Sequence, residues 1–187
     1  CAAAALLFTL KDFRLLAVLP IVGALLFAAA PAQVAKRFTT FSLTDLSARD
    51  RGAMLREGLH MIEAHPLVGV GPNMVEEEYA QYRDPAAVNQ INPHLHNVPL
   101  QIAAERGLPA LAVWIAFIVV LLRDLAVRFY RKQSRVLTAA ALAAVVGMLA
   151  AGMFEYNFGD SEFLMFFLIL VTLPFAADRP APPEPAA

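Results

Sequence analysis

One long uncharged segment constrains this chain more than any other feature. Leu15–Ala35 contains no charged side chain, and as a helix it would be about 31 Å long, which matches the hydrocarbon core of a bilayer. In the whole chain, 59% of the residues are hydrophobic and 17% are charged. A single soluble core of this length cannot bury so much apolar surface. The chain is therefore expected to be an all-α membrane protein, and neither a nucleic-acid binder nor a typical cytosolic enzyme.

Further apolar segments indicate more than one span. Residues 1–10 are typical of the end of a spanning helix, and later apolar segments are Leu108–Leu122, Val136–Phe154 and Phe163–Ala177. We therefore expect a polytopic helix bundle with the following parts: the end of one transmembrane helix and one complete one in 1–35, a large helical extramembrane loop in 36–107, three transmembrane helices in 108–177, and a disordered tail in 178–187. Cys1 stands where an initiator Met is expected, which favours a C-terminal fragment whose N-terminal half is missing.

The charges of the connecting segments predict the orientation. Residues 123–135 carry five basic groups and one acidic group, and basic loops stay in the cytoplasm. By alternation, the large loop 36–107 and the acidic connection 155–162 lie on the outer side, which is the periplasm of a bacterium. The tail is then cytoplasmic. In a bacterium, such a chain would lie in the inner membrane, where it contacts membrane lipids.

The outer loop contains a helix signal. Ser47 with Asp50 three positions later has the form of an N-cap with an acid at N3. The apolar residues that follow recur at helical spacing, which favours one apolar face made of Met54, Leu55, Leu59 and Ile62. The pattern predicts an amphipathic helix over about 48–64 that ends at His65-Pro66.

Three arginines lie in two turns of this helix: Arg49, Arg51 and Arg56. Their spacing alone favours a solvated helix face beside lipid headgroups. The alternative is an anion site, because a guanidinium group binds phosphate oxygens in a bidentate fork and keeps its charge. Such a site suits a pyrophosphate held at a membrane surface, and the spacing leaves both interpretations open.

A glycine-marked turn and a short acidic helix are expected next. Gly69 and Gly71 lack the preceding strand and the third glycine of a dinucleotide motif, so we interpret this turn as structural. Asn73 is predicted to cap a second helix with Glu76–Glu78 in its first turn. Consecutive helical residues point in different directions, so these acids are expected in solvent rather than at a metal ion.

Two imidazoles and an amide precede another predicted helix. His94, His96 and Asn97 come just before Pro99, which suits the first helical position, and the helix is expected to continue over Leu100–Arg106. The segment fits a capped helix entrance with incidental histidines. It also fits a base at a positive helix end, because an imidazole with an ordinary pKa near 6.5 can accept a proton from a hydroxyl at neutral pH.

A metal site is the remaining interpretation of the His-x-His pair. Zinc requires at least three protein ligands. The other histidines, His60 and His65, are not at the spacing of a known zinc motif. No metal site is therefore predicted.

Three blocks, in this order, resemble the O-antigen ligase and polymerase superfamily of bacterial envelope glycosyltransferases. The first is an arginine-bearing amphipathic helix followed by His65-Pro66-Leu67-Val68-Gly69-Val70-Gly71. The second is His96-Asn97, nine residues and Gly107, which is similar to the ligase pattern H-[NSQ]-x9-G-x-x-G, with Ala110 in place of its last glycine. The third and weaker block is Phe158–Ser161. The resemblance is to the superfamily more than to the ligases within it.

The resemblance implies a metal-independent, inverting glycan transfer at the periplasmic membrane face, without a cofactor. The donor would be a glycan on undecaprenyl pyrophosphate, and the acceptor would be lipid A-core in a ligase or another lipid-linked repeat in a polymerase. His96 would be the general base and Arg51 the pyrophosphate contact, with Arg49 as a near alternative to Arg51 or a further phosphate contact. Asn97 would orient substrate or cap the helix. Further basic residues are expected from the missing N-terminal half.

Other functions compete with this interpretation. An O-antigen or exopolysaccharide polymerase and a protein O-oligosaccharyltransferase belong to the same superfamily. A transporter of the bicarbonate-carrier kind is disfavoured, because transporters place charged groups near the middle of the membrane and these apolar segments carry none. A noncatalytic membrane scaffold would place Arg51 and His96 far apart, both in bulk water.

Overall fold

The computed structural model describes residues 46–178, and within this range the regular structure is entirely helical. The elements are α4 (Leu46–Ala64), α5 (Val75–Tyr82), α6 (Val98–Tyr130), α7 (Arg135–Gly152), the 3-10 helix η2 (Asn157–Gly159) and α8 (Ser161–Ala177). The all-α prediction is confirmed for this part of the chain. The predicted span Leu15–Ala35, the span end at 1–10 and the tail beyond Asp178 lie outside the described residues.

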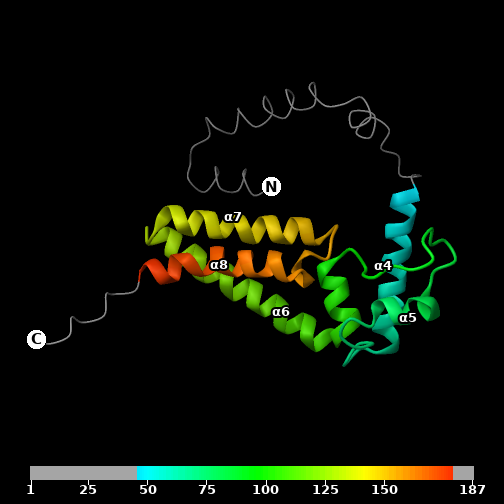
Figure 1. The fold of residues 1–187 in the computed structure, drawn as a ribbon. Helices are drawn as coiled ribbons and strands as arrows, with labels where there is room; N and C mark the ends of the chain where they lie inside the picture. The colour runs from blue at the N-terminus through cyan, green and yellow to red at the C-terminus, as the bar shows by residue number, and fades with distance from the viewer. Residues whose placement is uncertain (1–45, 179–187) are drawn as a thin grey trace, which may run out of the picture.

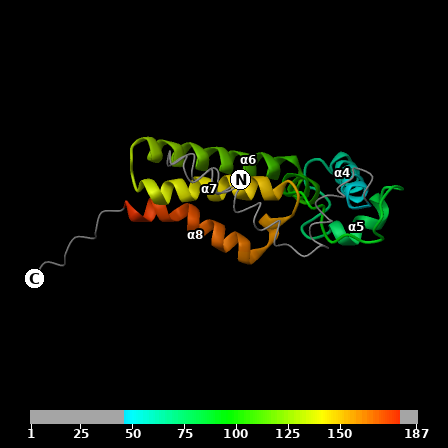
Figure 2. The ribbon, with the colours of Figure 1, turned by 90° about the horizontal axis from the view of Figure 1, so that it is seen from above.

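The helices form two groups, as Figures 1 and 2 show. In one group, α7 packs against both α6 and α8. In the other, α4 contacts α5 and also the beginning of α6, so α6 joins the two groups. Each group has its own apolar core, one of them around Leu125, Val145, Met148 and Phe167 and the other around Met54, Met61, Val75, Leu95 and Leu100.

Two described helices, α6 and α7, are long and apolar enough to cross a membrane, and α8 is a shorter apolar helix. Many of their apolar side chains point outward, such as Val113 and Phe166, which are 71% and 64% exposed. These helices occupy the three segments that were predicted as spans. α6 is longer than expected, because it continues to Tyr130 and only residues 131–134 form the turn to α7.

α6 is interrupted near its beginning. Gly107 has φ +80° and ψ 171° within an otherwise helical segment, and Pro109 follows, which has no amide hydrogen to donate. The turn before Gly107 therefore ends like a helix, with carbonyl groups that lack their usual partners. Residues 98–106 thus form a separate first section of α6, at the end where α4 lies.

The glycine turn before α5 packs against this interruption. The amides of residues 70 and 71 donate to the carbonyls of residues 104 and 105 over 2.8 and 3.0 Å, and the amide of Leu108 donates to Pro66 over 2.8 Å. The backbones approach so closely that a Cβ atom at Gly69 would lie 2.2 Å from the carbonyl carbon of Glu105. The glycine turn therefore has a structural role, as predicted. The segments His65–Gly71 and His96–Gly107, which carry the family resemblance, are in direct backbone contact.

The predicted end of the first helix is correct, but its predicted cap is wrong. α4 ends at Ala64 and already includes Ser47, so this serine lies within the helix. Asp50, predicted as a capping acid, accepts instead from the backbone amides of Val88 and Asn89 over 2.9 and 3.1 Å. The Asn89 side chain donates to the same carboxylate over 2.6 Å. Asp50 therefore holds the loop after α5 against α4.

The apolar face of α4 also differs from the prediction. Met54 is buried, but Leu55 and Leu59 are 51% and 45% exposed, and Glu57 and Gly58 lie on the buried side instead. Glu57 is fully buried, and one of its carboxylate oxygens accepts from the backbone amide of Asp84 over 2.8 Å. A prediction from the spacing of apolar residues does not count a buried acid or a glycine. The predicted buried face therefore lies on a different side of α4 from the observed one.

The predicted cap of the second helix is wrong as well. Met74, not Asn73, occupies the N-cap of α5, and it makes no side-chain capping bond. The backbone amide of Asn73 donates instead to the Glu105 carboxylate over 3.1 Å. Glu76–Glu78 lie in the first turn of α5, as predicted.

Candidate functional site

The first residues of α6 place two candidate side chains. Asn97 is the N-cap, and its side-chain oxygen accepts from the amide of Leu100 over 2.9 Å. Pro99 is the second helical residue, one position later than predicted. The Asn97 side chain also donates to the carbonyl of Met153 over 3.2 Å, which ties the start of α6 to the end of α7. The capping role of Asn97 is therefore present in the structure.

His96 lies next to this cap in an unusual backbone conformation. Its φ of +47° is in the left-handed region, which residues other than glycine seldom occupy. The preceding residue is fixed, because the amide of Leu95 donates to the buried side chain of Gln101 over 2.7 Å. A strained residue between two anchored neighbours is a frequent feature of functional sites.

Glu155 approaches both histidines from the segment after α7. Its Oε1 atom is 2.9 Å from Nδ1 of His96 and 3.0 Å from Nε2 of His94. The two imidazole centroids are 4.3 Å apart. Sequence analysis did not single out Glu155 as a site residue, since it lies 59 positions after His96. Its one available signal was its place in an acidic connection predicted on the same side of the membrane.

The Glu155 carboxylate is set up to accept from both rings. Burial raises the pKa of Glu155, but the backbone amide of Tyr156 and the two histidines outweigh this, and the net pKa lies below its usual value. An ionised carboxylate can only accept hydrogen bonds. His96 in its neutral form therefore carries its proton on Nδ1, and this leaves a free lone pair on Nε2.

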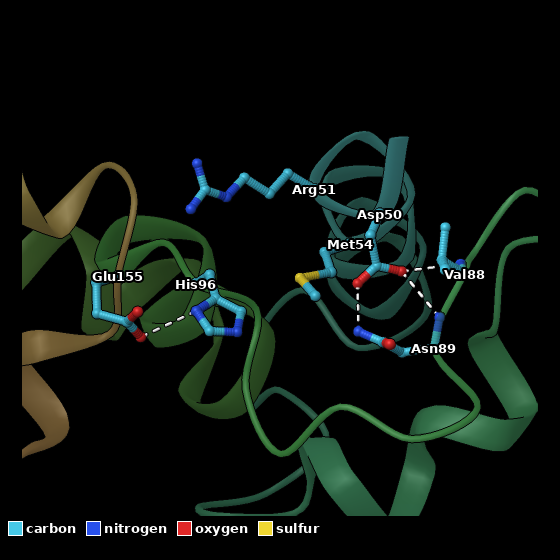
Figure 3. A pocket seen from close by; sticks show the side chains of 7 residues that line it. All are labelled: Asp50, Arg51, Met54, Val88, Asn89, His96 and Glu155. Carbon is cyan, nitrogen blue, oxygen red and sulfur yellow. Dashed lines mark hydrogen bonds and ion pairs between the residues drawn. The ribbon is translucent and has the colours of Figure 1, made fainter. Parts of the chain in front are cut away.

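Arg51 reaches the same region from α4. Its guanidinium carbon is 6.0 Å from the ring centroid of Phe154, the residue before Glu155. Arg51 and His96 line two pockets in common, with volumes of about 340 Å³ and about 180 Å³. In Figure 3, the Arg51 side chain extends from α4 towards the side of the larger pocket where His96 and Glu155 lie. An imidazole, a guanidinium and a carboxylate thus surround one open cavity.

The other two arginines of α4 lie elsewhere. Arg56 forms a bidentate pair with Asp84, with N–O distances of 2.6 and 3.1 Å. Arg49 is exposed and is not among the residues that line the two pockets. The structure brings Arg51 and His96 together, which differs from the separated arrangement expected of a noncatalytic scaffold.

An apolar groove lies along α6 near this site. It has a volume of about 740 Å³. It is lined by Arg106 and by apolar side chains, among them Val113, Trp114, Phe117, Phe158 and Leu164. A third pocket, of about 410 Å³, shares Tyr156 and Gly159 with this groove and is also lined by His94 and Glu155. The groove follows a helix that is apolar enough to cross a membrane. Sequence analysis did not predict this feature.

A comparison with known families agrees with these features. The family described as O-antigen ligase matches residues 1–115. The chain belongs to the O-antigen ligase family. Members of this family are membrane-associated, glycosyltransferase-like enzymes with glycan and lipid substrates. No curated protein matches the chain.

The matched region contains most of the site of this O-antigen ligase family member. Arg51, the turn His65–Gly71 and the segment His96–Gly107 lie inside it, whereas Glu155 lies beyond its end. The turn and the segment that ends at Gly107 pack on each other at the interruption of α6. The matched region therefore includes both Arg51 and His96, together with the contacts between the glycine turn and α6.

Proposed function

We propose that this protein is an O-antigen ligase-like glycosyltransferase. It moves a glycan from undecaprenyl pyrophosphate to an acceptor hydroxyl, that of lipid A-core, and it inverts the anomeric centre without a metal ion. The observation that carries the proposal is the pocket shared by Arg51 and His96, in a chain that belongs to the O-antigen ligase family. The family indicates the class of substrate, and the pocket offers the chemical groups.

His96 acts as the general base in this mechanism. Its Nε2 lone pair takes the proton of the acceptor hydroxyl while the hydroxyl oxygen attacks the anomeric carbon of the donor sugar. One carbon–oxygen bond forms as the bond from that carbon to the pyrophosphate breaks, so a single displacement inverts the centre. The 29% exposure of the His96 side chain leaves the ring accessible from the pocket.

Arg51 stabilises the leaving pyrophosphate. Negative charge grows on the bridging oxygen as the bond breaks, and a guanidinium at this point is more strongly attracted to the transition state than to the ground state. The neighbouring ring of Phe154 lets the planar cation pack while its N–H groups remain free to bind phosphate oxygens. A pyrophosphate is already a good leaving group, so a base and a cation suffice.

Glu155 is a positioning residue that acts through His96. Its contact with Nδ1, 2.9 Å long, selects the tautomer in which Nε2 is basic. It also stabilises the imidazolium that forms when the proton is taken. Glu155 does not contact the reacting atoms in this scheme, so its loss is expected to slow the reaction more than it weakens substrate binding.

The groove along α6 suits a lipid-linked substrate. Polyprenyl and acyl chains require an apolar surface, which Trp114, Phe117 and Phe158 supply. The groove shares Tyr156 with an adjoining pocket that is also lined by His94. A substrate whose lipid stays in the bilayer can thereby present its sugar at the site.

The charge distribution supports a periplasmic site in a multi-pass inner-membrane protein. The basic turn between α6 and α7, with Arg131 and Lys132, lies at the end of the helices away from α4 and α5 (Figure 1). The site lies at the opposite end, where α6 begins at residue 98. The positive-inside rule places the basic turn in the cytoplasm, which leaves the site on the other face.

The test is a transfer assay with the purified protein in lipid nanodiscs, with lipid-linked donor and acceptor. We expect His96→Ala to lower the transfer rate by about 10²-fold to 10⁴-fold and Arg51→Ala to lower it by about 10²-fold or more. Arg49→Ala is the matched control, since Arg49 lies on the same helix outside the two pockets. A His96→Ala protein that inserts normally and transfers at the wild-type rate would falsify the proposal.

A polymerase or a protein O-oligosaccharyltransferase is the second candidate. Ala110 occupies the position of the last glycine in the ligase pattern and lines the groove along α6, so the match to the ligase pattern is incomplete. Glycans from a strain without the protein separate these functions. Unligated lipid-linked polymer indicates a ligase, single repeat units indicate a polymerase, and unmodified proteins indicate an oligosaccharyltransferase.

A further inference from the structure

We propose that His94, His96 and Glu155 form a binding site for Zn²⁺, and that bound Zn²⁺ reversibly inhibits the transferase. The second part rests on the proposed function, whereas the first part rests on geometry alone. One ligand atom from each residue lies within 4.8 Å of the other two. Oε1 of Glu155 is 3.0 Å from Nε2 of His94 and 2.9 Å from Nδ1 of His96. This is a His₂Glu donor set of the kind that binds zinc in proteins.

Two of the three distances between ligand atoms are close to those that zinc requires. Bonds of about 2.0–2.2 Å in tetrahedral geometry place the ligand atoms roughly 3.3 Å apart. The two imidazole nitrogens are 3.0 and 2.9 Å from the carboxylate oxygen, so shifts of a few tenths of an ångström are needed there. The side chains are 30%, 29% and 54% exposed, which allows this adjustment. Water from the neighbouring pocket supplies the fourth ligand.

The donor set selects a transition ion over the common alkaline-earth ions. Imidazole nitrogen suits Zn²⁺ and its neighbours, whereas Mg²⁺ and Ca²⁺ prefer sites made of oxygen. Sequence analysis predicted no metal site because a third ligand for the His-x-His pair was missing. Glu155 supplies that ligand from a segment 61 residues after His94.

Zinc inhibits because it reverses the tautomer of His96. Without metal, Nδ1 donates to Glu155 and Nε2 holds the lone pair that takes the acceptor proton. Zinc on Nδ1 requires the lone pair there, so the proton of the neutral ring moves to Nε2. His96 then donates at the position where the base must accept. The ring stays neutral, and the metal also occupies the carboxylate oxygen that positions it.

The first measurement is zinc binding, by calorimetry with ZnCl₂ and the purified protein in lipid nanodiscs, with MgCl₂ as the comparison ion. We expect wild type to bind Zn²⁺ and not Mg²⁺, and His94→Ala to weaken zinc binding by at least about tenfold. Glu155→Gln keeps the shape of the side chain and is expected to weaken it similarly. His60→Ala is the matched control, because His60 is exposed on α4 and outside the cluster. Equal zinc affinity in wild type and both cluster variants overturns the site.

The second measurement is the transfer rate of each protein at rising Zn²⁺, relative to its own rate in a chelator. Wild type and His60→Ala are expected to lose activity as zinc occupies the site, and His94→Ala to require at least about tenfold more zinc. A wild-type protein that binds zinc and transfers at an unchanged rate contradicts the inhibition. A protein that requires zinc for transfer overturns both inhibition and metal independence but keeps the site. A His96→Ala protein with full activity overturns the proposed function and the inhibition that rests on it, whereas the zinc site is judged by the binding measurement.

Discussion

His96 combines a strained backbone with a directed side chain. Its left-handed conformation is one that glycine adopts without strain, yet an imidazole stands there between the fixed Leu95 and the helix cap Asn97. This conformation turns Nδ1 towards Glu155 and leaves the rest of the ring at the pocket that Arg51 lines. The orientation of the His96 ring therefore depends on its contact with Glu155, which comes from a distant segment of the chain.

The first prediction at this scale concerns Glu155→Gln. The amide still accepts from Nδ1 but carries no charge to stabilise the imidazolium, so we expect kcat to fall at least about tenfold while KM changes little. Glu162→Gln, in the first turn of α8, is the control and is expected to leave kcat unchanged. An equal loss in both variants, or a change in KM alone, argues against a positioning role.

The pH dependence of the Glu155→Gln effect follows from its lowered pKa. The ordinary glutamate pKa is 4.5, and that of Glu155 lies below it. The carboxylate is therefore ionised throughout the range above this value, and its contribution disappears only as the pH falls through the lowered pKa. We expect the ratio of wild-type to variant kcat to stay constant over roughly pH 8 to 9, well above the ordinary imidazole pKa near 6.5. It is expected to fall at lower pH, because the Glu155 charge favours the protonated base in wild type only. A ratio that changes over the alkaline range contradicts the assignment.

At the scale of elements, the interruption of α6 organises the site. Gly107 ends the first section of the helix, and the turn at 66–71 satisfies the carbonyls that this leaves free. α4 enters this turn directly, so the packing sets where Arg51 lies relative to His96. The turn at 66–71 and the first section of α6 are separated along the chain, but the position of each depends on the other.

Gly107→Ala is expected to destabilise the protein. The new Cβ would lie 2.3 Å from the carbonyl oxygen of Leu67, at a φ of +80°, so the two backbones must separate. A loss of about 1–3 kcal/mol or more is expected for strain of this kind. Thermal unfolding in nanodiscs, followed by circular dichroism, measures it.

Gly52→Ala serves as the matched control. Gly52 lies inside α4, where the nearest atom to a new Cβ is the end of the Arg56 side chain at 3.7 Å. Alanine there is expected to be neutral or to stabilise by about 0.5–1 kcal/mol, because glycine is unfavourable in helix interiors. Equal shifts of the thermal unfolding midpoint in the two variants would mean that the close packing at Gly107 does not stabilise the turn at 66–71.

At the scale of the molecule, the helices separate two chemical environments. The outward apolar side chains of α6 and α8 require a lipid-like surrounding, whereas α4 and α5 carry many exposed charges. The site lies where these environments meet. The proposed reaction, between a lipid-linked donor and a lipid-linked acceptor, would need this position, since neither lipid leaves the bilayer.

The orientation can be tested with cysteine labelling. In a Cys1→Ser background, Gln133→Cys in the basic turn and Glu77→Cys on α5 are both at exposed positions. The positive-inside rule predicts that a membrane-impermeant maleimide labels Glu77→Cys in intact spheroplasts and Gln133→Cys only in inverted vesicles. The reverse pattern would place the site in the cytoplasm.

The sequence alone determined the helical class of the described residues, the apolar segments and the family resemblance. Hydropathy is a property of consecutive residues, so it located the positions of α6, α7 and α8. The end of α4 at His65-Pro66 and the cap at Asn97 could also be predicted, because both depend on neighbouring residues in the chain. The residues around His96 also predict a general base there, and this role stays a prediction.

Only the tertiary structure decided which groups meet. Asp50 was expected to cap its own helix but binds a loop 38 residues away, and Glu155 joins two histidines that it follows by about 60 positions. Such contacts depend on how helices pack, which no local period records. Packing likewise brought Arg51 rather than Arg49 to His96, because a helix directs neighbouring side chains to different sides.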